Sequence, residues 1–263
     1  VGGAAAKDLN DLDAKTSVTV NASAVKEIIG SAAEIKTVLA AKTITKAADV
    51  AATVDSVISA ADANTISKAT TGVVTATVDA GTAAALKSAL AGVANDGLDA
   101  LTLTVTGTTA AAADLIALDA KTSVDVVVNA TTVTGNIADV TKVLVTDAAN
   151  FANLGDETVT ISGTVSAGQA NAIANATTGA VTATITAGIA SDLNTALANA
   201  TAADALKLTV NGETANATVL NALDGKTSVT VNAAAIKNIE GTATAVKAAY
   251  DANALKTISG LGD

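Results

Sequence analysis

The stretch Leu118-Asp119-Ala120-Lys121-Thr122-Ser123-Val124 decides how the chain is organised, because close copies of it occur twice more. The earlier copy runs from Leu12 to Val18, and the later copy runs from Leu223 to Val229. The lysines of the three copies lie 106 and 105 residues apart. A long period of this kind indicates a repeat protein, so the fold has to be interpreted from the repeat.

The three lysines divide the chain into four parts. Residues 1–14 are the end of a preceding repeat, residues 15–120 and 121–225 are two super-repeats, and residues 226–263 are part of a third. We expect these parts to form one continuous solenoid, in a chain that begins inside a repeat. In such proteins each unit contacts only its neighbours, and the core runs through all units.

Composition supports a core built from many small layers. Of the 263 residues 50% are hydrophobic but only 1% are aromatic, and the chain has no Cys, His, Met, Trp or Pro. General acid–base and nucleophilic catalysis mostly use His, Cys or an activated Ser, so we expect no enzyme. The formal net charge of −10 argues against a nucleic-acid partner. No window approaches eighteen apolar residues, so no membrane span is expected.

Alternating Val/Thr-rich segments, each followed by an Ala-rich segment, predict strands with one buried face. Five strands in each super-repeat give a unit of about 21 residues, which is typical of strand-plus-helix repeats. The predicted strands are 17–21, 35–39, 53–58, 73–79 and 101–106, then 123–129, 140–145, 158–165, 180–186 and 206–211, and finally 228–232, a marginal strand near 246, and 257–259.

Helices are predicted between the strands, for example over 82–94 and 189–200, where leucines recur at helical spacing. Strands about twenty residues apart cannot form tight hairpins, so they should be parallel. The predicted fold is therefore an α/β repeat, a solenoid of parallel strands and short helices. Leucine-rich repeats are the closest general architecture, although their Leu-rich signature is not matched.

The phase of the alternation predicts which side chains are buried and which face outward. The predicted core contains Val18, Val20, Val74, Val78, Leu103, Val105, Val126, Ile161, Val181, Ile185, Leu208, Val210 and Val229. The predicted outer face is a threonine lattice that includes Thr75, Thr77, Thr102, Thr104, Thr182 and Thr184. Lys15, Lys121 and Lys226, each two residues after an aspartate, are expected to form exposed ion pairs of small value.

Two further stretches carry a resemblance to a known class of proteins. Residues 69–77 read Ala-Thr-Thr-Gly-Val-Val-Thr-Ala-Thr, and the chain ends in Gly260-Leu261-Gly262-Asp263, a fragment of Gly-x-Gly-x-Asp. With the Ala/Val/Thr-rich repeats, which cover almost the whole chain, they resemble the giant repetitive cell-surface proteins of cyanobacteria. Those S-layer-like proteins frequently join such arrays to calcium-binding RTX nonapeptides. The resemblance implies an extracellular location, and it makes Asp263 a candidate calcium ligand in an incomplete motif.

Four functions are considered from the sequence. The first is a structural protein, a segment of a surface layer, filament or coat that works by rigidity and self-association, with copies of itself as partners and calcium as a possible cofactor. The second is an ice-binding protein that uses the outward threonines, and an adhesin is a further alternative. An enzyme acting on polysaccharides ranks last, because sugar platforms need aromatic side chains and the chain has one Phe and one Tyr.

Overall fold

The structure, a computed structural model, describes residues 2–262 and shows an α/β protein whose short strands pair in parallel in several sheets. Contacts divide the chain into two compact units. The first comprises Val1–Ala130 and Ala149–Asn153, and the second comprises Thr131–Ala148 and Leu154–Asp263. The parallel strands and the short helices between them confirm the predicted fold class at this level.

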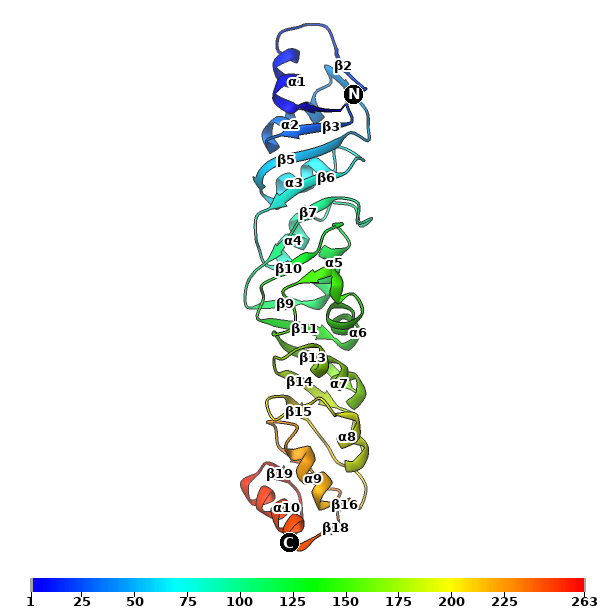
Figure 1. Cartoon of the computed structure of the whole chain (residues 1–263), viewed down its shortest axis with the longest axis vertical. Helices are drawn as coiled ribbons and strands as arrows, with labels where there is room; N and C mark the ends of the chain where they lie inside the picture. The colour runs from blue at the N-terminus through cyan, green and yellow to red at the C-terminus, as the bar shows by residue number, and fades with distance from the viewer. Residues whose placement is uncertain (1, 263) are drawn as a thin grey trace. The chain divides into compact units, whose positions relative to one another are not determined.

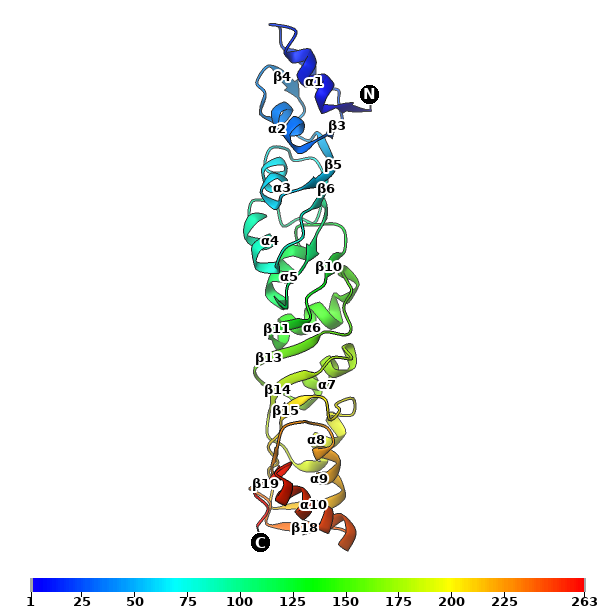
Figure 2. The same cartoon turned by 90° about the vertical axis from the view of Figure 1, so that its left-hand side faces the viewer.

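One sheet of the first unit places its strands in sequence order. They are β1 (Gly3–Ala5), β3 (Glu27–Gly30), β5 (Ala51–Ile58), β6 (Val74–Val78) and β7 (Ala100–Thr102). Helices follow the first four of them and lie along one side of the sheet (Figure 2), namely α1 (Ala6–Asp13), α2 (Ala32–Ala40), α3 (Ala60–Ser67) and α4 (Ala83–Ala89). Shorter parallel pairs complete the unit: β2 (Val20–Ala22) with β4 (Ile44–Lys46), and β10 (Val126–Val128) with β8 (Thr104–Val105) and β12 (Phe151–Ala152). Strand β9 (Thr109–Ala111) leads into α5 (Ala112–Asp119).

The second unit repeats this arrangement. Strands β11 (Thr132–Asn136), β13 (Thr158–Val165), β14 (Val181–Ile185) and β15 (Ala205–Lys207) pair in sequence order (Figure 1). The helices are α6 (Ile137–Thr141), which continues into a π-helical turn over Lys142–Thr146, α7 (Ala167–Ala176), α8 (Ala190–Ala196), α9 (Ala217–Asp224) and α10 (Ala243–Leu255). Two short pairs follow, β16 (Thr214–Asn216) with β18 (Asn238–Glu240) and β17 (Val231–Asn232) with β19 (Ile258–Ser259). A 3₁₀ turn covers Ala148–Asn150.

Several helices begin at a Ser, Thr or Asn whose side chain accepts a hydrogen bond from the backbone two or three residues later. Ser31 and Ser166 form full capping boxes with Glu34 and Gln169. Such residues satisfy backbone N–H groups that the first helical turn leaves free. The other side-chain caps are Ser59, Thr82, Asn136, Asn216 and Thr242.

Three predicted strands are helical in the structure. Residues 35–39 lie in α2, residues 140–145 span α6 and the π-helical turn, and Val246 lies in α10. A short apolar run is compatible with a buried helix as well as with a strand. The capping residues Ser31 and Thr242, directly before positions 32 and 243, favour the helix. The strands predicted at 53–58, 73–79, 158–165 and 180–186 are confirmed.

Eleven of the thirteen predicted core residues are buried, but Val18 and Val229 are not. Val18 is 72% exposed and Val229 is 38% exposed. Both lie in a bend before the strand starts, at Val20 and Val231 respectively. The alternation of a strand therefore cannot be extended back to them. The eleven buried residues confirm the phase that the sequence predicts for the strands themselves.

Candidate functional site

The outward threonines lie where the sequence predicts them. Thr75, Thr77, Thr102, Thr182 and Thr184 are exposed, whereas Thr104 is half-buried. In the first unit Thr53 pairs with Thr75 and Thr77 pairs with Thr102, and in the second unit Thr134, Thr160 and Thr182 occupy one register across three strands. We call these eight residues and Thr104 the threonine face, in each unit separately.

Irregular positions interrupt the threonine face. The register between β13 and β14 shifts after Thr160, so Thr164 rather than Ser162 pairs with Thr184. Lys207 pairs with Thr184 on the other side. In the first unit, Thr53 Oγ1 donates a hydrogen bond of 2.6 Å to the carboxylate of Glu27. The threonine face is therefore a mixed polar surface that carries charge at its margins.

A second threonine arrangement is buried and recurs with the repeat. Thr122 Oγ1 donates to the carbonyl of Leu101 at 2.8 Å, accepts from the Leu101 N–H at 3.1 Å, and accepts from the Val124 N–H. Thr227 makes the same bonds to Leu206 and Val229. One hydroxyl thus satisfies backbone groups of an adjacent strand and of its own turn, as buried polar groups require. We call Thr122, Thr227 and their counterparts Thr70 and Thr177 the buried threonine clamps.

Thr70 and Thr177 also bond backbone carbonyls of a segment about 20 residues earlier. Thr70 Oγ1 lies 2.6 Å from the Val50 carbonyl oxygen, and Thr177 Oγ1 lies 2.7 Å from that of Glu157. The chain approaches so closely here that a Cβ on Gly179 would lie 2.2 Å from the Glu157 carbonyl oxygen, which explains why a glycine follows the threonines.

Two buried or partly buried aspartates complete the clamps. Asp204 accepts from the Val181 N–H at 2.7 Å and the Thr201 N–H at 2.8 Å, and its carbonyl accepts from the Ser228 N–H. Asp99 accepts from the Val74 N–H and the Ser67 hydroxyl in the same manner. Each aspartate therefore bonds two segments of the chain, one before it in the sequence and one after it. Each segment is about 23–25 residues from the aspartate. Sequence reasoning did not identify these residues, although their recurrence 105 residues apart was the available signal.

The repeated lysines behave differently from the prediction of exposed ion pairs. Lys121 is buried, and its Nζ donates to the Val93 carbonyl at 2.9 Å and to Asn95 Oδ1 at 3.0 Å. Lys226 donates to the Leu197 carbonyl at 2.8 Å. Burial lowers the pKa of the Lys121 ammonium, because the charged form loses solvation. The prediction was therefore wrong for Lys121 and Lys226, whose ammonium groups bond backbone carbonyls of earlier segments, whereas Lys15 is exposed as predicted.

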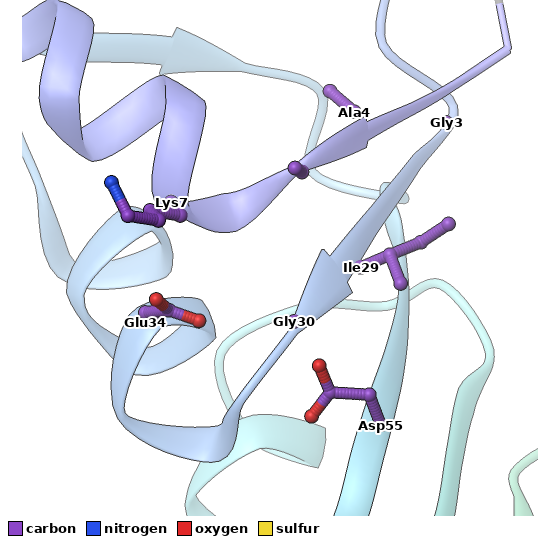
Figure 3. Close-up of a pocket in the computed structure, with 8 residues that line it drawn as sticks. Gly3, Ala4, Lys7, Ile29, Gly30, Glu34 and Asp55 are labelled. Atoms are coloured by element: carbon purple, nitrogen blue, oxygen red, sulfur yellow. The ribbon is translucent and has the colours of Figure 1, made fainter.

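A shallow hollow of about 430 Å³ lies beside β1, α1 and α2 (Figure 3). Gly3, Ile29 and Gly30 form its floor, and Lys7, Glu34 and Asp55 stand at its rim. Glu34 accepts hydrogen bonds from the Ser31 hydroxyl and backbone, which lower the pKa of its carboxyl. Lys7 pairs with Asp11. Two of the rim charges, Lys7 and Glu34, are thus engaged in local contacts of the helices.

The calcium prediction for Asp263 falls on a residue outside those the structure describes. Within residues 2–262 no three or more Asp, Glu, His or Cys side chains are grouped to hold a metal ion. The sequence Leu-Gly-Asp at 261–263 also occurs at 154–156, 107 residues earlier. None of the helices formed by residues 2–262 combines the length and apolar character needed to cross a lipid bilayer.

Comparison with known proteins finds no relative of this chain. No family model, no curated protein and no solved structure matches the chain.

Proposed function

We propose that the chain is a structural repeat protein whose strands and helices form solenoid coils, and that it serves as a segment of an extracellular surface layer, filament or coat. A coil is here one helix with the strands on either side of it. The protein acts through stiffness and through association with copies of itself. The parallel pairing of strands in sequence order within each unit supports this proposal.

The observation that carries the proposal is the recurrence of the buried threonine clamps. Thr70, Thr122, Thr177 and Thr227 are each less than a tenth exposed, and each bonds the backbone of a segment about 20 residues earlier. Apolar contact alone would let layers of small aliphatic side chains slide. The directional hydrogen bonds of the four clamps fix the register between the layers that they join, as an array that bears load requires.

Charge sets a condition on association. Copies with a net charge of −10 repel each other, so salt or divalent cations should favour assembly by screening or bridging carboxylates. Light scattering and electron microscopy of the full chain, with calcium, with magnesium and with a chelator, test the proposal. We expect filaments or sheets that grow with the cation. A strictly monomeric particle under all three conditions would contradict self-association.

An ice-binding role is a second candidate because of one observation. Thr134, Thr160 and Thr182 stand in register on three parallel strands, where neighbouring strands lie about 4.8 Å apart and alternate residues about 6.8 Å apart. Such a row presents hydroxyl and methyl groups at regular intervals to water. Thermal hysteresis of the purified chain tests this role, with Thr160→Lys as the variant expected to abolish it. Absence of hysteresis in the unaltered chain rules the role out.

A further inference from the structure

Lys121 combines a buried amine with a side-chain amide at contact distance. The residue is 5% exposed, and its Nζ lies 2.9 Å from the Val93 carbonyl oxygen and 3.0 Å from Asn95 Oδ1. Because an amide carbon is about 1.2 Å from its oxygen, the Asn95 Cγ lies within about 4.2 Å of the Lys121 nitrogen. Atoms react from a separation of about 3–3.5 Å, so a small rotation of the exposed Asn95 side chain brings the two into range.

The backbone of the segment that carries Asn95 is fixed next to Lys121. The Gly97 N–H donates to the carbonyl of Ala120 at 3.1 Å, directly before Lys121 in the sequence. Gly97 has a φ of 62°, a conformation that glycine adopts without strain. The fold therefore holds the amine and the amide together, and groups held in this way react as if they were highly concentrated.

We propose that Lys121 and Asn95 react to form an amide cross-link within one chain, between segments 26 residues apart. The neutral Lys121 Nζ attacks the Asn95 Cγ and forms a tetrahedral intermediate. A proton passes from the attacking nitrogen to Nδ2, the Cγ–Nδ2 bond breaks, and ammonia leaves. One C–N bond replaces another, so the reaction needs no oxidant, reductant or further reactant.

The surroundings of Lys121 favour the neutral amine that the reaction requires. Burial lowers the pKa of the Lys121 ammonium, and both of its hydrogen-bond acceptors are uncharged. Asn95 is exposed, so water reaches its carboxamide and can transfer the proton and carry away the ammonia. The link forms after folding, and until then Lys121 is an ionisable amine with the two hydrogen bonds described above.

The second super-repeat has the same lysine without the amide beside it, which makes it an internal control. Lys226 Nζ donates to the Leu197 carbonyl at 2.8 Å, and within residues 2–262 it makes no hydrogen bond to an amide side chain. The segment 90–99 of the first super-repeat is two residues longer than its counterpart 197–204. The amide next to Lys121 therefore belongs to the longer segment and is not a general feature of the repeat.

The cross-link would brace the first unit. It closes a covalent loop, and such loops stabilise the folded state mainly by restricting the unfolded chain. Because the link forms inside one chain, it needs no second copy and does not depend on the proposed self-association. A chain that becomes linked but stays monomeric contradicts self-association alone, whereas a chain that assembles without the link contradicts the link alone.

Digestion of the denatured full chain by a protease that cleaves before aspartate tests the link. Such cleavage separates Asn95, in the piece 79–95, from Lys121, in the piece 119–124, and leaves Lys226 in the piece 224–250. After incubation of the folded chain at pH 9, we expect mass spectrometry to find the first two pieces joined, with their summed mass reduced by one ammonia. The piece with Lys226 should keep its full mass. An imide formed at Asn95 alone would not join two pieces.

Asn95→Ala is the matched variant, since it removes the amide from an exposed position and leaves the bond from Lys121 to the Val93 carbonyl. We expect the joined pieces to be at least about tenfold more abundant in the unaltered chain than in this variant. Circular dichroism checks that both chains are folded. Two separate pieces at full mass after incubation of the unaltered chain, or equal amounts of the joined pieces in both chains, would overturn the proposal.

Discussion

Thr122 and Leu101 exchange two hydrogen bonds, because the threonine hydroxyl donates to the leucine carbonyl at 2.8 Å and accepts from the leucine N–H at 3.1 Å. Both residues are buried, and Thr227 repeats the arrangement with Leu206. The hydroxyl replaces the partners that a continuous sheet would give Leu101 at this place. The short strands can therefore end inside the protein without leaving backbone groups unsatisfied.

Replacing Thr122 by valine should destabilise the chain strongly. The change keeps the shape but removes the partner of the Leu101 N–H and carbonyl, and each buried group left without a partner costs about 1–3 kcal/mol. We expect a loss of at least about 2 kcal/mol in the free energy of unfolding, measured by urea denaturation. Thr16→Val is the matched control and should change it by less than about 0.5 kcal/mol. Equal effects at the two positions would contradict the role of burial.

Glu157→Val should stabilise the second unit. Glu157 is buried, its Oε2 accepts only the Gly155 N–H at 2.7 Å, and its Oε1 has no hydrogen-bond partner among residues 2–262. The corresponding residue 107 positions earlier is the buried Val50. We expect a gain of about 1–2 kcal/mol, since a buried charge without an ion pair is costly.

The reciprocal change Val50→Glu should cost several kcal/mol for the same reason. Thermal unfolding followed by circular dichroism measures both variants. A loss of stability in Glu157→Val would mean that the bond to Gly155 outweighs the burial of the carboxylate.

Lys121→Met should show a pH-dependent stability difference from the unaltered chain. The folded pKa of Lys121 lies below its ordinary value of 10.5 because the side chain is buried. Between these two values the unfolded chain binds more protons than the folded chain, so the stability of the unaltered chain rises with pH relative to the variant. At neutral pH we expect the variant to lose about 1–3 kcal/mol, because the Val93 carbonyl loses its donor.

Urea unfolding at pH 7, 9 and 10 measures this trend, and Lys15→Met, at the exposed lysine of the first copy, is the control. A difference between Lys121→Met and the unaltered chain that stays constant over this range would show that burial does not perturb Lys121.

Val78→Asp should disrupt its layer and cost several kcal/mol, because an unpaired charge would enter a layer of aliphatic side chains. Its neighbour Thr77 points to the opposite face and is exposed, so Thr77→Asp should change stability by less than about 1 kcal/mol. Limited proteolysis locates the damage. We expect new cleavage around residue 78 in the first variant only, and unchanged cleavage there would contradict the assigned phase of β6.

Much of the local structure could be predicted because it depends on neighbours in the sequence. Val74, Ala76 and Val78 alternate with threonines, so the strand and its buried face follow from the side-chain period of two. The helices at 35–39 and 246 were missed because a short apolar run fits both helix and strand. There the capping residues Ser31 and Thr242 hold the decisive signal.

By itself, the sequence determined the period of the chain, the parallel α/β class and the phase of the main strands, because these follow from recurrence and from the alternation of small aliphatic and hydroxyl side chains. Only the tertiary structure decided which recurring residues work together. Lys121, Thr122 and Asp99 bond backbone groups that lie about 21–28 residues away, and carbonyls and amides are the same at every position of a sequence. The packing of one segment on the next selects the groups that meet, and it also distinguishes a buried Leu118 from an exposed Leu12 of the same type.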